Sequence, residues 1–248
     1  MARSMIGAGM SGCVLKCHMA PTAGRAALVR KVYPQFNAVG SVTLNKPLGG
    51  LNPDAVVTAG KMGARYVWFP TMDAKAYMEH RHQPDAGMGL TVKDADGTLC
   101  APAKKVIEAA VKYDMIIGTG HLSPQESLMI VRYASSCGAK RICVTHVTHP
   151  NSWMDSNQLK EAQDLGAYIE FSYNHINSGQ CSWERAVSQI QEVKMERLLL
   201  TTDFGQKKNV MPVEGMIEFL SRLSGLGVSD GVLKRALCDN PRAILGIN

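Results

Sequence analysis

Short apolar runs alternate along this chain with longer stretches of helical character. The runs show little polar alternation, which is typical of strands buried on both faces of a parallel sheet. They predict seven strands, over residues 12–18, 36–44, 64–69, 115–119, 141–145, 167–172 and 198–202. The stretches that follow them predict helices over residues 22–32, 53–61, 102–111, 124–137, 155–165, 183–193 and 212–223.

Repeated strand–helix alternation with short loops predicts the α/β class, as a (β/α) TIM-like barrel with a parallel sheet. Such a barrel has eight strands, whereas only seven are visible here. Residues 1–11 resemble the end of a helix. We therefore expect an N-terminally shortened barrel that lacks its first strand, with residues 1–248 forming a single domain.

Residues 74–100 interrupt the alternation and predict an insertion within this domain. The turn sequence Asp94-Ala95-Asp96-Gly97 separates two short apolar segments, which favours a β-hairpin. Because the insertion follows a barrel strand, we expect it to form a flap over the site. His80 and His82 lie in this irregular segment and are the weaker candidates for metal binding.

Composition narrows the classes of partner and compartment. The formal net charge is +6, but the basic residues are spread along the chain and aromatic residues make up only 6%, so we expect no nucleic-acid surface. No apolar run is long enough for a membrane span. The number of cysteines, seven, is odd, and the sequence shows no signal peptide. Both observations favour free thiols and a cytoplasmic protein.

Three strand ends carry side chains that bind metals. His121 follows the strand at 115–119, His146 ends the strand at 141–145, and Asp203 follows the strand at 198–202. In a (β/α) barrel all such ends meet at one face, where the active site lies. Two histidines and an aspartate are suitable ligands for a divalent metal. The alternative for each is a structural role, such as capping the loop or helix that follows.

A second set of polar residues at the same strand ends predicts contacts with substrate. They are Lys16, His18, Asn45, Asn52, Thr71, Asp73, His149 and Gln206. Lys16 and His18 share one face of their strand, where they either bind ligand or form a hydrogen-bonded structural pair. The glycine-rich loop between Asn45 and Asn52 is either an anion cradle or an ordinary turn, and both asparagines are also candidate helix caps.

These residues resemble the amidohydrolase superfamily of metal-dependent TIM-barrel hydrolases, and more closely an uncharacterised branch of it, a domain family of unknown function. The resemblance runs nearly end to end. It rests on Val14-Leu15-Lys16-Cys17-His18, Gly49-Gly50-Leu51-Asn52-Pro53, Val67-Trp68-Phe69-Pro70-Thr71, Gly118-Thr119-Gly120-His121-Leu122-Ser123, Val144-Thr145-His146, Thr202-Asp203-Phe204-Gly205-Gln206 and Asn240-Pro241-Arg242-Ala243-Ile244-Leu245-Gly246. It implies that His121 and His146 match the metal-binding histidines after strands five and six, and that Asp203 matches the aspartate after strand eight.

The chain departs from the superfamily pattern at two places. The first strand of the superfamily carries a His-x-His pair of ligands, and that strand is not visible here. The carboxylated lysine that often follows strand four has no counterpart, because Trp68-Phe69-Pro70-Thr71 stands there. A mononuclear site is therefore expected rather than a lysine-bridged binuclear centre.

The leading hypothesis is a metal-dependent hydrolase of a small amide, ester, lactone or phosphoester. It would use metal-activated water with Asp203 as the base, and zinc as the expected metal, with manganese or iron as alternatives. The other hypotheses are a small-molecule-binding barrel that has lost part of its metal site, and a metal-dependent decarboxylase or lyase on the same fold. An open sheet edge also favours a homo-oligomer.

Overall fold

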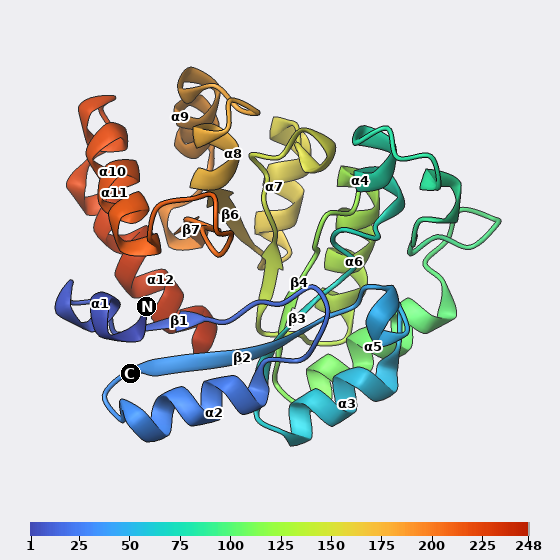
Figure 1. The fold of residues 1–248 in the computed structure, drawn as a ribbon. Helices are drawn as coiled ribbons and strands as arrows, with labels where there is room; N and C mark the ends of the chain where they lie inside the picture. Colours follow the sequence, from blue (N-terminus) through green and yellow to red (C-terminus); the bar gives the residue numbers. More distant parts are fainter. Residues whose placement is uncertain (248) are drawn as a thin grey trace.

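The computed structural model describes residues 1–247, and its centre is a seven-stranded parallel sheet in the order β1-β2-β3-β4-β5-β6-β7. The sheet curls into a half-barrel with helices around its outer face (Figure 1). The strands are β1 Gly12–Val14, β2 Asn37–Thr43, β3 Ala64–Trp68, β4 Ile116–Gly118, β5 Ile142–Val144, β6 Tyr168–Ser172 and β7 Leu198–Thr201. Seven parallel strands of an α/β TIM-like barrel confirm the predicted fold class.

The predicted helices are present, with ends that move by one or two residues. The helices are α1 Ala2–Gly7, α2 Ala23–Val32, α3 Pro53–Lys61, α4 Lys75–His80, α5 Ala101–Lys112, α6 Pro124–Ser136, α7 Ser156–Asp164, α8 Tyr173–Asn177, α9 Trp183–Glu192, α10 Pro212–Gly225, α11 Asp230–Lys234 and α12 Asn240–Leu245. Short helical turns lie at Lys46–Leu48, Ala86–Met88, Pro150–Ser152, Met195–Arg197 and Arg235–Asp239. Within residues 1–247, no helix combines the length and the apolar character needed to cross a membrane.

The larger helices begin where the chain supplies a cap. At α6 the Ser123 side chain accepts from the backbone N–H of Glu126, and the Glu126 carboxylate accepts from the Ser123 N–H. This reciprocal pair satisfies two donors that the first helical turn would otherwise leave open. Asp155 and Gln158 form the same arrangement at α7. These caps fix the directions in which the chain leaves the loops that follow β4 and β5.

The amino ends of the strands are closed by apolar packing. One buried cluster gathers inward-facing strand residues with a residue of α12: Tyr66, Trp68, Ile116, Cys143, Tyr168, Leu199 and Ile244. Asn240 in α12 donates to the carbonyl of Leu198 at the start of β7, at 2.8 Å. Because α12 fills this end of the half-barrel, polar chemistry is left to the carboxyl ends of the strands.

The insertion over residues 74–100 contains α4, a short helical turn and a loop. Its predicted hairpin is represented by one antiparallel bridge, between Lys93 and Leu99. The Leu90 N–H donates to the Asp73 carbonyl at 2.7 Å, which anchors the segment beside the end of β3. From α4, Tyr77 reaches the ring of His121, with ring centres 4.8 Å apart. The insertion therefore contacts a residue at the carboxyl ends of the strands, and its role as a flap stays a prediction.

Candidate metal centre

His146 and Asp203 have a backbone conformation that residues other than glycine rarely adopt. Their φ angles are +55° and +52°. Left-handed backbone at such residues costs about 1–3 kcal/mol each and is concentrated at functional sites. Each residue stands just beyond the carboxyl end of its strand, β5 or β7. The turn redirects the chain at the face where the three candidate ligands were expected.

His121 is held in place through its own backbone. Its N–H donates to the Pro70 carbonyl at 2.9 Å, and its carbonyl accepts from the Asn151 side chain at 2.7 Å. The preceding Gly120 has a φ of +66°, and a Cβ there would collide with the carbonyl oxygens of Phe69 and Pro70. Only glycine permits this close approach, which explains the Thr119-Gly120-His121 sequence.

His146 lies near each of the other two predicted ligands. The ring centres of His121 and His146 are 5.4 Å apart, and His146 Nε2 lies 3.9 Å from Asp203 Oδ2. Two imidazoles bound at ordinary zinc–nitrogen distances to one tetrahedral ion have ring centres about 5 Å apart, and the bound atoms are about 3.4 Å apart. The observed spacing is slightly wider than a closed site. Within residues 1–247, no group of three or more His, Cys, Asp or Glu side chains is arranged so that it could hold a metal ion.

His121 lacks partners for both ring nitrogens. Its side chain is buried, and neither Nδ1 nor Nε2 has a hydrogen-bond partner among the described residues. Burial, followed by the positive charge of Lys16, holds the pKa of His121 well below its usual value, so the ring is neutral. Burying a polar nitrogen without a hydrogen-bond partner lowers the stability of the folded protein. A metal bound to the free lone pair would offset part of this loss, so His121 fits the expected metal.

Lys16 enters the centre of the site from the residues that follow β1. Its ammonium lies 3.3 Å from His146 Nε2, and it also lies over the ring of Trp68, 5.2 Å from the ring centre. Burial raises the pKa of Asp203, but the positive charge of Lys16 and the charges of His146 and His18 outweigh it, so the pKa lies below its usual value. Asp203 is therefore a carboxylate at neutral pH.

Glu170 is a site residue that the sequence analysis missed. It is 7% exposed in β6, its Oε1 lies 3.4 Å from His146 Nδ1, and the hydroxyl of Thr201 donates to the same oxygen at 2.6 Å. Burial raises its pKa, but the interactions with His146 and Thr201 outweigh this and keep the pKa below its usual value. The signal in the sequence was an acid within the apolar run of a strand buried on both sides.

A chain of side-chain amides supports Asp203. Asn174, the second residue of helix α8, donates to Asp203 Oδ2 at 3.4 Å. Asn209 in turn donates to Asn174 Oδ1 at 3.3 Å and to Gln206 Oε1 at 2.6 Å. Gln206 therefore belongs to the surroundings of Asp203, as predicted, but acts through Asn209. Its role in substrate binding stays a prediction.

His18 and Thr71 join the ends of β1 and β3. His18 Nδ1 lies 2.8 Å from the Thr71 hydroxyl, which also accepts from the Asn45 amide at 2.9 Å. Thr71 is fully buried, and His18 is the only acceptor in reach of its hydroxyl proton among the described contacts. We therefore assign the His18 proton to Nε2. Burial and then Lys16 lower the pKa of His18 to about 4, so the ring is a neutral N–H donor.

Two other predicted substrate contacts have structural partners. Asp73 accepts from the backbone N–H of Lys46 at 2.7 Å, which ties the loop after β2 to the end of β3. Asn52 accepts from the backbone N–H groups of Asp54 and Ala55, so it is the N-cap of α3. Asn52 thereby follows the capping alternative that the sequence left open.

His149 and His175 extend the cluster beyond His146. The ring centres of His149 and His175 are 4.8 Å apart, and those of His146 and His175 are 5.1 Å apart. Burial, followed by the charges of His146 and His80, lowers the pKa of His149 to about 3. The rings of His121, His146, His149 and His175 thus line one continuous wall beneath α4, and His175 was not among the predicted site residues.

Comparison with known families gives one match over most of the chain. The family described as a family of unknown function, DUF6282, matches residues 1–170. The matched part includes Lys16, His121, His146 and Glu170, whereas Asp203 lies beyond it. No curated protein matches the chain.

Solved structures with the same fold are hydrolases by name. The organophosphorus hydrolase from Deinococcus radiodurans has a TM-score of 0.63 at 15% identity, over 99% of this chain and 81% of that one. An amidohydrolase from Pseudomonas aeruginosa has a TM-score of 0.64 at 12% identity, over 98% and 80%. The probable dipeptidase PvdM from Pseudomonas aeruginosa has a TM-score of 0.68 at 12% identity, over 98% and 87%. This likeness establishes an amidohydrolase-like barrel fold.

Proposed function

The chain belongs to the family of unknown function DUF6282 and has an amidohydrolase-like barrel, and from its site we propose that it is a metal-dependent hydrolase of a small molecule. The observation that carries the proposal is the meeting of His121, His146 and Asp203 at the carboxyl ends of β4, β5 and β7. The proposed substrates are small amides, esters, lactones or phosphoesters.

The charges in the site support a divalent cation. Glu170 and Asp203 contribute two negative charges, and the Lys16 ammonium contributes one positive charge, while the surrounding histidines with lowered pKa values are neutral. Leaving His146 aside, these groups together carry one net negative charge. Buried charge without compensation is unfavourable, so a cation held by His121, His146 and Asp203 is consistent with these surroundings. Zinc is the proposed metal, with manganese or iron as alternatives.

When bound there, a divalent metal would polarise the scissile bond and lower the pKa of water toward neutrality. Asp203 is ionised and partly exposed, so its carboxylate can accept a proton from an attacking water. The Glu170 carboxylate lies beside His146 Nδ1 without a hydrogen bond to it, so its charge alone would favour a proton on that nitrogen and leave the Nε2 lone pair directed at the site. His18 presents an Nε2–H that can donate to an oxygen of the substrate.

The test measures metal and hydrolysis together. Purified protein is stripped with chelator, reloaded with zinc, manganese or iron, and analysed for bound metal. It is then incubated with p-nitrophenyl acetate, a γ-lactone and a p-nitrophenyl phosphodiester. We expect about one metal per chain and hydrolysis of at least one substrate class that Asp203→Asn abolishes. Protein that retains no metal under any loading would overturn the proposal.

A small-molecule-binding barrel without metal chemistry is the second candidate. The contact between the Lys16 ammonium and His146 Nε2 favours it, because this contact uses the lone pair that a metal would need. Metal analysis separates the two functions. Specific ligand binding by metal-free protein, without turnover in any metal-loaded form, would support the binding barrel.

A further inference from the structure

The Nε2 atom of His146 has one lone pair and faces one cation already. Glu170 Oε1 lies 3.4 Å from His146 Nδ1 but does not form a hydrogen bond with it, whereas the Lys16 ammonium, which can only donate, lies within reach of Nε2. We therefore assign the ring proton to Nδ1. The lone pair is then on Nε2, where the Lys16 ammonium lies at 3.3 Å. An ammonium has only donors and needs such an acceptor. A metal bound to Nε2 would need the same lone pair.

We propose that Lys16 is an internal cation that a divalent metal must displace, so that its ammonium weakens the metal affinity of the site. The inference rests on the proposed function, because it assumes that His146 is a metal ligand. It goes further by giving Lys16 a role opposite to that of a substrate-binding or metal-binding residue.

The surroundings explain why an ammonium lies there in metal-free protein. Glu170 is buried and ionised directly behind His146, and Asp203 lies 3.9 Å from the same Nε2 atom. The positive charge of Lys16 lowers the pKa of both carboxyl groups, against the effect of their burial. Without metal, the Lys16 ammonium thus brings a positive charge to the Nε2 atom of His146, next to Asp203.

The contact is also weak enough to be broken. At 3.3 Å it is longer than an ordinary charge-assisted hydrogen bond. The ring of Trp68, which is stacked on Tyr66 with centres 3.9 Å apart, offers the ammonium a second favourable surface. The four-carbon stem of lysine is flexible, so the ammonium can leave His146 and stay over Trp68. Displacement therefore does not require Lys16 to leave the site.

The test compares Lys16→Met with wild-type protein and with Lys61→Met. Lys61 is exposed at the end of α3, so its variant has the same net charge as Lys16→Met but an unchanged site. Zinc and manganese dissociation constants are measured on metal-free protein by competition with a chromophoric chelator. Because a cation next to a divalent ion is strongly repelled, we expect Lys16→Met to bind zinc at least tenfold more tightly, and Lys61→Met to match the wild type.

A second measurement separates this effect from a change in folding. Metal-free Lys16→Met should melt at a lower temperature than wild type, because two carboxylates lose their cation, and zinc should raise its melting temperature more than that of wild type. If Lys16→Met does not fold, Lys16→Gln keeps a donor without the charge and is titrated in its place.

The outcomes distinguish this inference from the proposed function. Wild-type protein that binds zinc, with Lys16→Met equal or weaker, would overturn the inference alone and make Lys16 a supporting residue. If neither wild type nor the Lys16 variants bind zinc or manganese, both ideas are wrong. Tight binding by Lys16→Met, with weak or no binding by wild type, would support the inference.

Discussion

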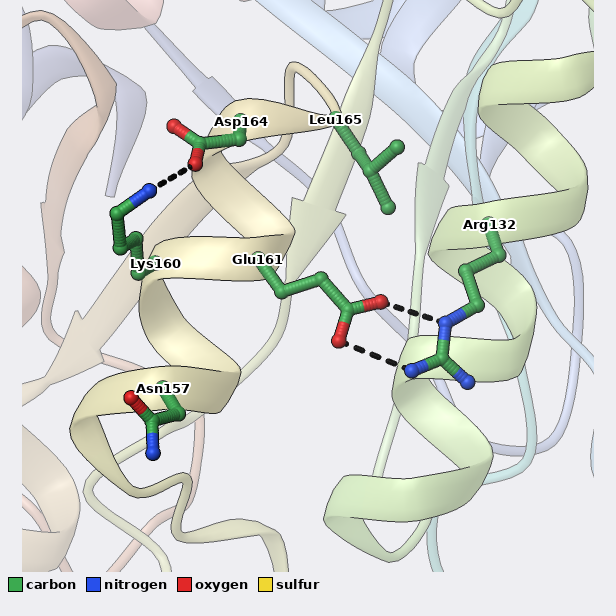
Figure 2. A pocket seen from close by; sticks show the side chains of 6 residues that line it. All are labelled: Arg132, Asn157, Lys160, Glu161, Asp164 and Leu165. Atoms are coloured by element: carbon green, nitrogen blue, oxygen red, sulfur yellow. Dashed lines mark hydrogen bonds and ion pairs between the residues drawn. The ribbon is translucent and has the colours of Figure 1, made fainter.

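Two charged regions of this molecule are built on opposite principles. On the surface, a groove between α6 and α7 holds Arg132 and Glu161 in a two-pronged ion pair with N–O distances of 2.5 and 2.9 Å (Figure 2). Nearby, Asp164 pairs with both Lys160 and Lys194, at 2.5 and 2.6 Å. Each of these charges is exposed and each has an opposite partner. In the candidate metal centre, by contrast, the polar groups are buried and His121 has no partner.

The two regions differ in whether their polar side chains have partners within the protein, and a cluster with unpartnered groups is the better candidate for binding a ligand. The groove satisfies its own charges, so it needs no ion or substrate and serves to link neighbouring helices. The candidate metal centre leaves the buried imidazole of His121 without partners and holds His146 and Asp203 in left-handed backbone conformations. A bound cation, as we propose, would relieve the first of these unfavourable features. Four experiments test this difference between the two regions.

The largest effect is expected from His146→Asn. Asparagine tolerates the left-handed backbone at this position better than alanine does, so the change removes the imidazole with little added strain. We expect loss of nearly all bound zinc, measured by elemental analysis after dialysis. His82→Asn is the matched control, because His82 is exposed and has a φ of +50°. Equal zinc content in the two variants would contradict the site.

The next effect is expected from Glu170→Gln. The amide has nearly the same shape but no charge, so it no longer favours the proton on His146 Nδ1. Loss of such a supporting group typically weakens metal binding by about 10–100-fold. Nitrogen NMR of His146 should report a shift in the proton position that a purely structural role would not cause. Glu192→Gln, at the exposed end of α9, is the control. Unchanged affinity would place Glu170 outside the metal chemistry.

Acid should destabilise the metal-free protein through its buried histidines. The folded pKa values of His18 and His149 are about 4 and about 3, below the unfolded value of 6.5. The unfolded chain therefore binds more protons between these values, so the free energy of unfolding is highest above about pH 6.5 and falls as the pH drops toward 3. Urea unfolding at several pH values measures the slope, which His149→Asn should reduce. A slope that His149→Asn leaves unchanged would assign the loss to other groups.

The smallest effect is expected in the surface groove. Arg132→Met breaks an exposed ion pair with Glu161, which is worth about 0.2–1 kcal/mol of folding free energy. Urea unfolding should detect this small loss, and a double-mutant cycle with Glu161→Gln isolates the pair. Zinc affinity should not change. A change in zinc affinity would mean that the groove and the metal centre are coupled, contrary to the comparison.

The hydrophobic pattern was sufficient for the fold because strand and helix periods are local properties. Unalternating apolar runs located all seven strands, and the Ser123-to-Glu126 capping box located the start of α6. The helix α4 within the insertion was not predicted, because its short segment Lys75–His80 has no clear apolar period. The short helix α8 was missed for the same reason, and with it the place of His175 in the cluster.

The candidate site, too, was predicted from the sequence only in part. The strand pattern alone predicted that His121, His146 and Asp203 would share one face, because the carboxyl ends of parallel strands meet at one edge of the sheet. The packing of the folded chain places Glu170 Oε1 3.4 Å from His146 Nδ1 and the Lys16 ammonium 3.3 Å from His146 Nε2. These contacts join residues that are 24 to 130 positions apart in the chain. Such distances depend on the curl of the sheet and on side-chain packing, which no local pattern encodes.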